Sequence, residues 1–117
     1  MSELELLAER LGRELLSRKE SLAIAESCTG GWAAQAVTAV AGSSAWFDRG
    51  FVTYSNDAKL EMLGVAATTL ERHGAVSEAT ARAMAQGALK HSRATWALAI
   101  TGIAGPTGGT PAKPVGM

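Results

Sequence analysis

The segment Glu26–Gly31 (ESCTGG) constrains the fold more than any other part of this chain. It follows a short apolar run, Leu22–Ala25, and precedes an Ala-rich stretch, Trp32–Ala41. This order predicts a buried strand, a tight glycine turn and a helix. Such a turn presents backbone N–H groups at a helix N-terminus, where they attract anions.

The remaining segments continue the alternation of strands and helices. Ser2 and Glu5 have capping-box spacing, Ser55 and Ser77 stand where N-caps are expected, and Gly64 is placed to end a helix. The expected helices cover residues 3–18, 32 to about 42, 56–63, 68–73 and 78–91, and the expected strands cover 21–25, 47–54 and 96–101, the last of them buried. This alternation predicts an α/β fold, a layered sheet with helices on its faces.

Ligands of such sheets bind beyond the carboxyl ends of the strands. Three loops leave the expected strand ends, at residues 26–31, 55–59 and 102–109. If the strands are parallel, these loops meet at one edge of the sheet. We therefore expect the functional site at this edge.

Composition excludes several classes of protein. The 117 residues suit one domain, and 11 basic against 11 acidic residues give no electrostatic preference for nucleic acid or an anionic membrane. Cys28 is the single cysteine, so no internal disulfide forms. The acidic N-terminus is unlike a signal peptide and no apolar run is long enough to span a bilayer, so we expect a cytoplasmic protein. No cluster of His, Cys and acidic residues predicts a metal site.

The glycine turn holds three residues that can act as nucleophiles. Ser27 is either a nucleophile or a helix N-cap, and Thr29 has the same two readings. Cys28 lies near a helix N-terminus, which favours its thiolate, but free cysteines are mostly buried. Neighbours in an extended segment point to opposite sides, so we expect Cys28 in the core, away from Ser27. A hydrolase that depends on Cys28 stays open as a further hypothesis.

Lys59 stands in the first turn of an expected helix, where its charge opposes the helix dipole. It is either a solvated side chain or a partly dehydrated amine that acts as a base toward Ser27. Tyr54 either relays a proton or orients this amine, or it packs on the sheet. The loop Thr101–Gly109 is either a ligand-binding loop rich in backbone N–H groups or a flexible surface loop, and it is neither a Walker A loop nor a Rossmann fingerprint.

Four motifs in this order resemble the CinA C-terminal domain family: ESCTGG, FDRGFVTYSNDAK, HGAVS and AITGIAGPTGG. The resemblance extends from about Leu6 to Gly116. It implies a three-layer α/β/α fold with a largely parallel or mixed central sheet, and assembly into homo-oligomers. Characterised members are nicotinamide mononucleotide amidases, so it also implies hydrolysis of that carboxamide to nicotinate mononucleotide and ammonia, with no cofactor.

Site residues are carried over from the family position by position. Ser27 matches the nucleophile, Lys59 the general base and Tyr54 the tyrosine that accompanies them. Pocket positions are matched by Thr29, Gly30, Gly31, Thr101, Gly102, Gly105 and, more weakly, Asn56. The alternative to an enzyme is a nucleotide-binding module of the same family that lacks catalysis.

The chain departs from the family pattern after the segment Lys113–Gly116. Family members continue there with a further strand and a C-terminal helix. We expect residues 1–117 to form a single domain without these elements. An exposed sheet edge and an uncovered apolar face would follow, unless an oligomeric partner covers them.

Overall fold

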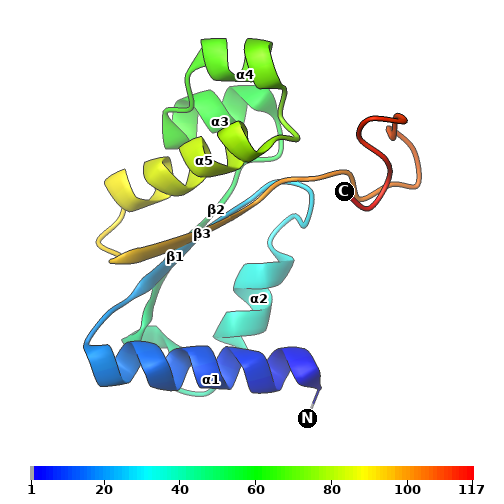
Figure 1. The fold of residues 1–117 in the computed structure, drawn as a ribbon. Coiled ribbons are helices and arrows are strands. Elements are labelled where there is room, and N and C mark those ends of the chain that lie inside the picture. The colour runs from blue at the N-terminus through cyan, green and yellow to red at the C-terminus, as the bar shows by residue number, and fades with distance from the viewer. Residues whose placement is uncertain (1) are drawn as a thin grey trace.

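The computed structural model of the chain describes residues 2–117. Three layers are visible in Figure 1, with a twisted sheet between one group of helices below it and another above it. The elements in chain order are α1 (Glu3–Arg18), β1 (Leu22–Glu26), α2 (Trp32–Thr38), the 3₁₀ helix η1 (Ser43–Ala45), β2 (Phe47–Val52), α3 (Asn56–Leu63), α4 (Ala67–His73), α5 (Glu78–Lys90) and β3 (Trp96–Ile100). The predicted α/β class and layering are confirmed.

The sheet contains three parallel strands in the order β2-β1-β3. The central strand β1 is buried along its whole length. Its side chains alternate between the two layers, because Leu22 and Ile24 pack against α1 and α2 while Ala23 and Ala25 pack against α3 and α5. A strand with helices on both faces needs apolar residues at every position, which is why the run from Leu22 to Ala25 carries no alternation.

Two apolar clusters hold the helices on the sheet. The lower one joins α1 and α2 to β1, and Gly12 of α1 lets the ring of Trp46 lie against the helix backbone. The upper one joins α3 and α5 to β1 through Leu63, Val65, Met84 and Ala88. Gly87 of α5 lies so close to α3 that an added Cβ would overlap the Leu63 carbonyl oxygen.

Helix ends follow the sequence signals closely. The side chains of Ser2, Ser55 and Ser77 accept hydrogen bonds from Glu5, Ala58 and Thr80 N–H groups, as N-caps do, and α3 ends at Gly64 in the left-handed region. Helix α2 is shorter than predicted. It ends at Thr38, where the Ser43 hydroxyl donates to the last helical carbonyl and the chain turns into η1.

The prediction that strand β3 is buried is wrong. It is an edge strand, with Trp96 50% and Leu98 46% exposed. An apolar groove of about 390 Å³ runs beside it, lined by Leu11, Leu15, Leu22, Trp96, Ala97 and Leu98 together with Glu14 and Arg18. The exposed sheet edge and the uncovered apolar face that the sequence led us to expect are both present here. Their cover by an oligomeric partner stays a prediction.

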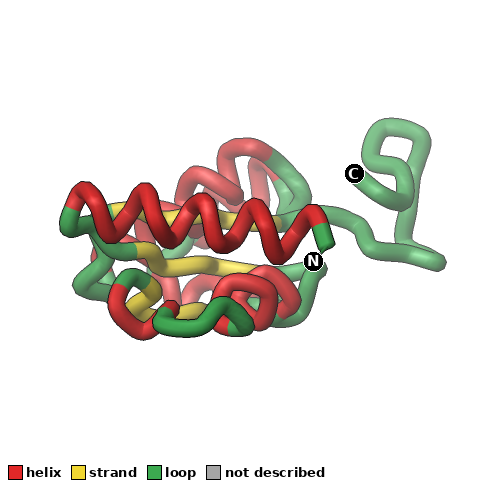
Figure 2. Tube along the Cα trace, turned by 90° about the horizontal axis from the view of Figure 1, so that it is seen from below, coloured by secondary structure: helices red, strands yellow, loops and turns green. Residues whose placement is uncertain are grey.

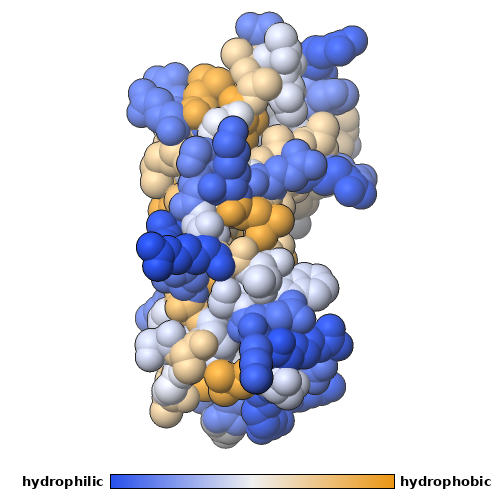
Figure 3. Space-filling view, turned by 90° about the vertical axis from the view of Figure 1, so that its left-hand side faces the viewer, coloured by the Kyte–Doolittle hydropathy of each residue, from blue (hydrophilic) through white to orange (hydrophobic). Residues whose placement is uncertain are grey.

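The two ends of the sheet differ in what surrounds them. After β3 the chain leaves the layers as a loop, residues 101–117, which Figure 2 shows beyond the carboxyl ends of the strands. The opposite end is seen in Figure 3, where hydrophilic side chains separate small hydrophobic patches. This loop and the carboxyl ends of the strands lie on the side of the sheet where the site is expected.

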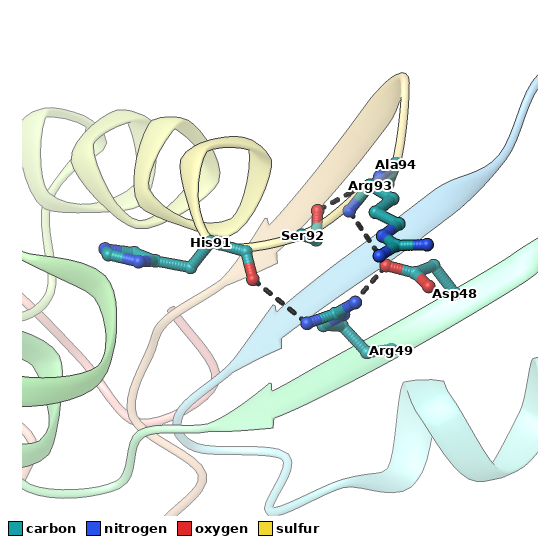
Figure 4. A network of polar contacts seen from close by, with 6 residues as sticks. All are labelled: Asp48, Arg49, His91, Ser92, Arg93 and Ala94. Carbon is teal, nitrogen blue, oxygen red and sulfur yellow. Dashed lines mark hydrogen bonds and ion pairs between the residues drawn. The ribbon is translucent and has the colours of Figure 1, made fainter.

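A polar network fastens this opposite end of the sheet. Asp48 of β2 accepts hydrogen bonds from Arg49 Nε at 2.8 Å and from the Arg93 backbone N–H at 3.0 Å, and Arg49 also donates to the His91 carbonyl (Figure 4). The Arg93 N–H and then the Arg49 side chain hold the pKa of Asp48 below its usual value. The network therefore ties β2 to the turn between α5 and β3.

We expect Gly87→Ala to destabilise the fold, because its Cβ would overlap the Leu63 carbonyl and force α5 away from α3. Overpacking of this kind costs about 1–3 kcal/mol. Thermal unfolding measures the loss, and Gln86→Ala on the exposed side of the same helix should stay within about 0.5 kcal/mol of the parent. Equal stability of the two variants would contradict the close helix contact.

We expect Asp48→Asn to lower the free energy of unfolding at pH 7 by about 1 kcal/mol. The pKa of Asp48 is lower in the folded state than in the unfolded chain, so its stabilising contribution is present at neutral pH and disappears as the pH falls through the folded value. Urea unfolding at pH 7 and in strong acid measures this. A difference between variant and parent that persists in acid would contradict the role of the carboxylate.

Candidate active site

Three chain segments converge beyond the carboxyl ends of the strands. Because the strands are parallel, the segments after Glu26, Val52 and Ile100 leave the sheet at the same edge, as predicted. Backbone hydrogen bonds fix their relative positions: Ser27 N–H donates to the Ile100 carbonyl at 2.9 Å, and Thr53 N–H donates to the Glu26 carbonyl at 2.8 Å. The convergence brings the glycine turn next to the start of α3.

The Lys59 side chain reaches from the first turns of α3 into this junction. It is only 1% exposed. Its Nζ lies 2.9 Å from Ser27 Oγ, 2.8 Å from the Thr53 carbonyl and 3.2 Å from the Tyr54 carbonyl. No carboxylate pairs with this amine anywhere in residues 2–117. A buried lysine without a counter-ion is a costly arrangement that a purely structural position would not need.

Burial lowers the pKa of Lys59, and a charge on the neighbouring Cys28 acts in the opposite direction. The geometry suits a neutral amine. Its two N–H bonds can donate to the two carbonyls, which leaves the lone pair facing the Ser27 hydroxyl. In this state the amine can take the hydroxyl proton, which is the task of a general base.

The expectation of a free anion site at the N-terminus of α2 is wrong. The Glu26 carboxylate already occupies it, accepting hydrogen bonds from the backbone N–H groups of Ala33 and Ala34 at 2.8 and 2.9 Å. Thr29 donates its hydroxyl to the same carboxylate at 2.6 Å. Neither Ser27 nor Thr29 caps the helix through its side chain, so the Ser27 hydroxyl is left to Lys59.

Burial acts to raise the pKa of Glu26, but the hydrogen bonds from Thr29 and the backbone N–H groups together outweigh it. The pKa of Glu26 is consequently lower than usual, and the group is a carboxylate at neutral pH. The N–H groups of Ala33 and Ala34 at the start of α2 are therefore not available to a second anion.

A cavity of about 330 Å³ opens above the Ser27–Lys59 pair. Its walls are formed by the glycine turn, the segment after β2, the start of α3, the connection between α4 and α5, and the loop after β3. The lining residues are Ser27, Cys28, Tyr54, Lys59, Ala75, Val76, Thr101, Gly102, Ile103, Ala104, Gly105, Thr107 and Gly108. No acidic side chain lines it.

The structure separates the residues predicted for this pocket into two groups. Six line the cavity: Ser27, Lys59, Tyr54, Thr101, Gly102 and Gly105. Four do not: Thr29, Gly30, Gly31 and Asn56. Thr29 is turned toward Glu26, and Asn56 is an exposed residue at the start of α3.

Ala75 and Val76 are pocket residues to which the sequence analysis assigned no role. They belong to the connection between α4 and α5, which is tied to the loop after β3 by a hydrogen bond from the Thr101 hydroxyl to the Ala75 carbonyl at 2.8 Å. The motif HGAVS, residues 73–77, is the only signal that pointed to them. Their small apolar side chains carry no chemistry that a sequence pattern could reveal.

The expectation that Cys28 is a core residue facing away from Ser27 is also wrong. Cys28 is only partly buried and lines the same cavity. The alternation of side chains applies to extended strands, and β1 ends at Glu26, so the residues after it follow the geometry of a turn. Cys28 thus lies beside the serine and influences the lysine.

Tyr54 contributes through two different parts. Its backbone carbonyl accepts a hydrogen bond from Lys59 and lies 3.5 Å from Ser27 Oγ. The residue as a whole is 72% exposed and is one of those that line the cavity. The carbonyl therefore orients the amine, while most of the residue is open to solvent.

Two further findings concern metal ligands and membrane-spanning helices among the described residues. Across residues 2–117, no group of three or more His, Cys, Asp or Glu side chains is placed to hold a metal ion. In the same residues, none of the helices has the length and apolar character needed to cross a membrane.

A parallel three-layer α/β fold with a serine and a buried lysine below a cavity at its strand ends defines a candidate serine hydrolase. Comparison with known proteins makes this specific. Residues 4–117 match the CinA C-terminal domain family, and the chain belongs to that family. The resemblance seen in the sequence motifs is confirmed.

Individual relatives cover nearly all of the chain. It is 58% identical over 115 residues to the nicotinamide-nucleotide amidohydrolase PncC of Escherichia coli strain K12, a match that spans 98% of this chain and 70% of that protein. It is 56% identical to a putative competence-damage inducible protein of Symbiobacterium thermophilum, of which it covers 27%. The crystal structure of the competence/damage inducible protein CihA from Agrobacterium tumefaciens superposes with a TM-score of 0.96, at 55% identity, over 99% of this chain and 70% of that one.

We expect the Lys59 amine to titrate below the ordinary lysine value of 10.5, because burial disfavours its charged form. NMR titration of the Lys59 Cε signal in ¹³C-labelled protein measures it directly. Cys28→Ala should lower the pKa of Lys59 further, since it removes the neighbouring group that raises it. A titration midpoint at or above 10.5 would rule out a neutral base.

Proposed function

We propose that this chain is an amidohydrolase that converts nicotinamide mononucleotide to nicotinate mononucleotide and ammonia, with Ser27 as nucleophile and Lys59 as general base. The observation that carries the proposal is the 2.9 Å contact between Ser27 Oγ and the buried Lys59 Nζ at the floor of the cavity. An amidohydrolase is the enzyme class that the relatives' names support, and those names print a nicotinamide nucleotide as the substrate. That it is the mononucleotide is what the resemblance to the family implies.

The chemistry begins with transfer of the Ser27 proton to the neutral Lys59 amine. Ser27 Oγ then forms a bond to the carboxamide carbon, whose oxygen becomes an oxyanion. As this tetrahedral species collapses, Lys59 returns the proton to the departing nitrogen and ammonia leaves. Water, deprotonated by the same amine, attacks the ester and releases the carboxylate with Ser27 restored.

Backbone N–H groups of the turn are the donors proposed for the oxyanion. Ser27 and Gly30 N–H groups are occupied by the Ile100 and Ser27 carbonyls. The N–H groups of Cys28 and Thr29 have no acceptor within the residues that the structure describes. They follow the nucleophile directly, which is where acyl-transfer enzymes place such donors.

The cavity suits a small nucleotide. Its size is at the lower end of the range of small-molecule sites. The hydroxyl of Thr107 and the glycine-rich backbone of the loop offer neutral hydrogen-bonding groups for a ribose and a phosphate, and no carboxylate in the lining repels the phosphate. The exposed ring of Tyr54 offers a surface for a pyridine ring.

Two wider expectations belong to the same proposal. The resemblance to the family implies a homo-oligomer, and the composition of the chain is typical of a cytoplasmic protein. Size-exclusion chromatography coupled to light scattering tests the first, and fractionation of the source cells tests the second.

The decisive experiment measures ammonia release and nicotinate mononucleotide formation from nicotinamide mononucleotide. We expect Ser27→Ala to reduce kcat by at least about a thousandfold, because removal of the nucleophile abolishes the covalent route. Lys59→Arg should lose about a hundredfold or more, since a guanidinium stays protonated and cannot act as a base.

Each alternative has its own outcome in this experiment. Activity that survives in Ser27→Ala but not in Cys28→Ala would assign the nucleophile to the thiol. Binding of the nucleotide by the unsubstituted chain in calorimetry, without any ammonia release, would instead establish a non-catalytic nucleotide-binding module.

A further inference from the structure

Glu26 is the least expected residue in the core of this protein. It closes the central strand β1, which has helices on both faces, and it is 1% exposed. Positions of this kind are normally apolar, and a buried carboxylate is unfavourable unless its oxygens are well satisfied. The contacts of Glu26 therefore indicate what it is for.

Every side-chain hydrogen bond that Glu26 accepts comes from the segment that follows Ser27. Thr29 Oγ1 donates at 2.6 Å and Ala33 N at 2.8 Å to one carboxylate oxygen, and Ala34 N donates at 2.9 Å to the other. The residue before the serine thus holds both the middle of the turn and the first turn of α2.

The backbone of the serine is held from its other sides by the sheet. Ser27 N–H donates to the Ile100 carbonyl of β3, and the Ser27 carbonyl accepts from Gly30 N–H at 3.0 Å. The Glu26 carbonyl accepts from Thr53, the residue whose own carbonyl binds Lys59. The strands and the Glu26 side chain together leave the serine little freedom to move relative to the amine.

We infer that Glu26 is a positioning residue for the nucleophile: its carboxylate, bridged by Thr29 and the start of α2, sets the short contact between Ser27 Oγ and Lys59 Nζ. This inference rests on the proposed function. Glu26 acts through the turn and does not line the cavity. Its carboxylate also occupies the N–H groups of Ala33 and Ala34 at the N-terminus of α2.

A carboxylate is required here, and an amide of the same shape is not equivalent. The two oxygens accept from three donors, and at least one donor approaches each oxygen. In Glu26→Gln one oxygen becomes an NH₂ group that faces an N–H or an O–H, so one donor loses its acceptor. The turn can then relax, and the serine moves with it.

The experiment compares four variants of the whole chain. Thr29→Val removes one donor to Glu26, Thr29→Ser restores it, and Glu26→Gln disrupts the carboxylate itself. Thr38→Val is the matched control, because it also removes a threonine hydroxyl that donates hydrogen bonds, but at the end of α2 far from Ser27, where the acceptors are the Ala34 and Gln35 carbonyls. Thermal unfolding by circular dichroism checks that each variant folds.

Two readouts are taken for each variant: kcat and KM with nicotinamide mononucleotide, and the rate at which a fluorophosphonate labels Ser27, followed by mass spectrometry. We expect Thr29→Val to lower kcat and the labelling rate about tenfold and Glu26→Gln about a hundredfold, since displacement of a reacting group by about 1 Å has effects of this size. KM should change less than about twofold, because neither residue lines the cavity. Thr38→Val should match the parent, and Thr29→Ser, which keeps the hydroxyl that donates to Glu26, should recover most of what Thr29→Val loses.

Unchanged kcat and unchanged labelling in folded Thr29→Val would overturn the inference, as would a rise in KM alone, which would indicate a ligand contact instead. If Glu26→Gln does not fold, the Thr29→Val and Thr29→Ser pair decides the matter. If the parent chain hydrolyses no nucleotide but is labelled at Ser27, the proposed substrate is wrong, and the labelling rates still test the role of Glu26.

Discussion

The arrangement of this protein depends on one buried amine. Lys59 Nζ has no carboxylate partner among residues 2–117 and lies within hydrogen-bonding distance of two carbonyls and one hydroxyl. Burial of an unpaired cation is strongly unfavourable, so the surroundings favour the neutral amine at the expense of some stability. Stability given up at a single position is typical of functional sites, and here it provides a base next to a hydroxyl that has no other task.

Glu26 is a second buried ionisable group, but here the surroundings favour the charged form. Its carboxylate keeps its charge because hydrogen bonds from Thr29, Ala33 and Ala34 replace the lost water. Neither group has a charge partner in the part of the chain that the structure describes, but the Glu26 carboxylate is satisfied by three neutral hydrogen-bond donors. In the proposed mechanism Lys59 provides the base, and Glu26 stabilises the turn that carries the Ser27 nucleophile.

Local elements were predictable because their signals are local. A serine at an N-cap and a glycine at a C-cap satisfy backbone groups within a few residues, so the bounds of α1 and α3 were predicted correctly from Ser2, Ser55 and Gly64. Helix α2 was predicted too long, because its end depends on a hydroxyl from Ser43 and on the burial of Trp46 against α1. The predicted burial of β3 failed for a related reason: a strand's exposure depends on its neighbours in the sheet, and β3 has a neighbour on one side only.

By itself, the sequence determined the alternation of strands and helices and the residues capable of acyl-transfer chemistry, since these follow from periodicity, capping and residue type. Only the tertiary structure decided which of those residues share a site. The fold places Ser27 next to Lys59, which lies 32 positions further along the chain. It directs the Thr29 hydroxyl to Glu26. It also places Cys28, Ala75 and Val76 among the residues that line the cavity. The physical reason is that hydrogen bonds between strands and the packing of helices determine which loops lie next to one another. The sequence of one loop contains no information about its neighbours in space.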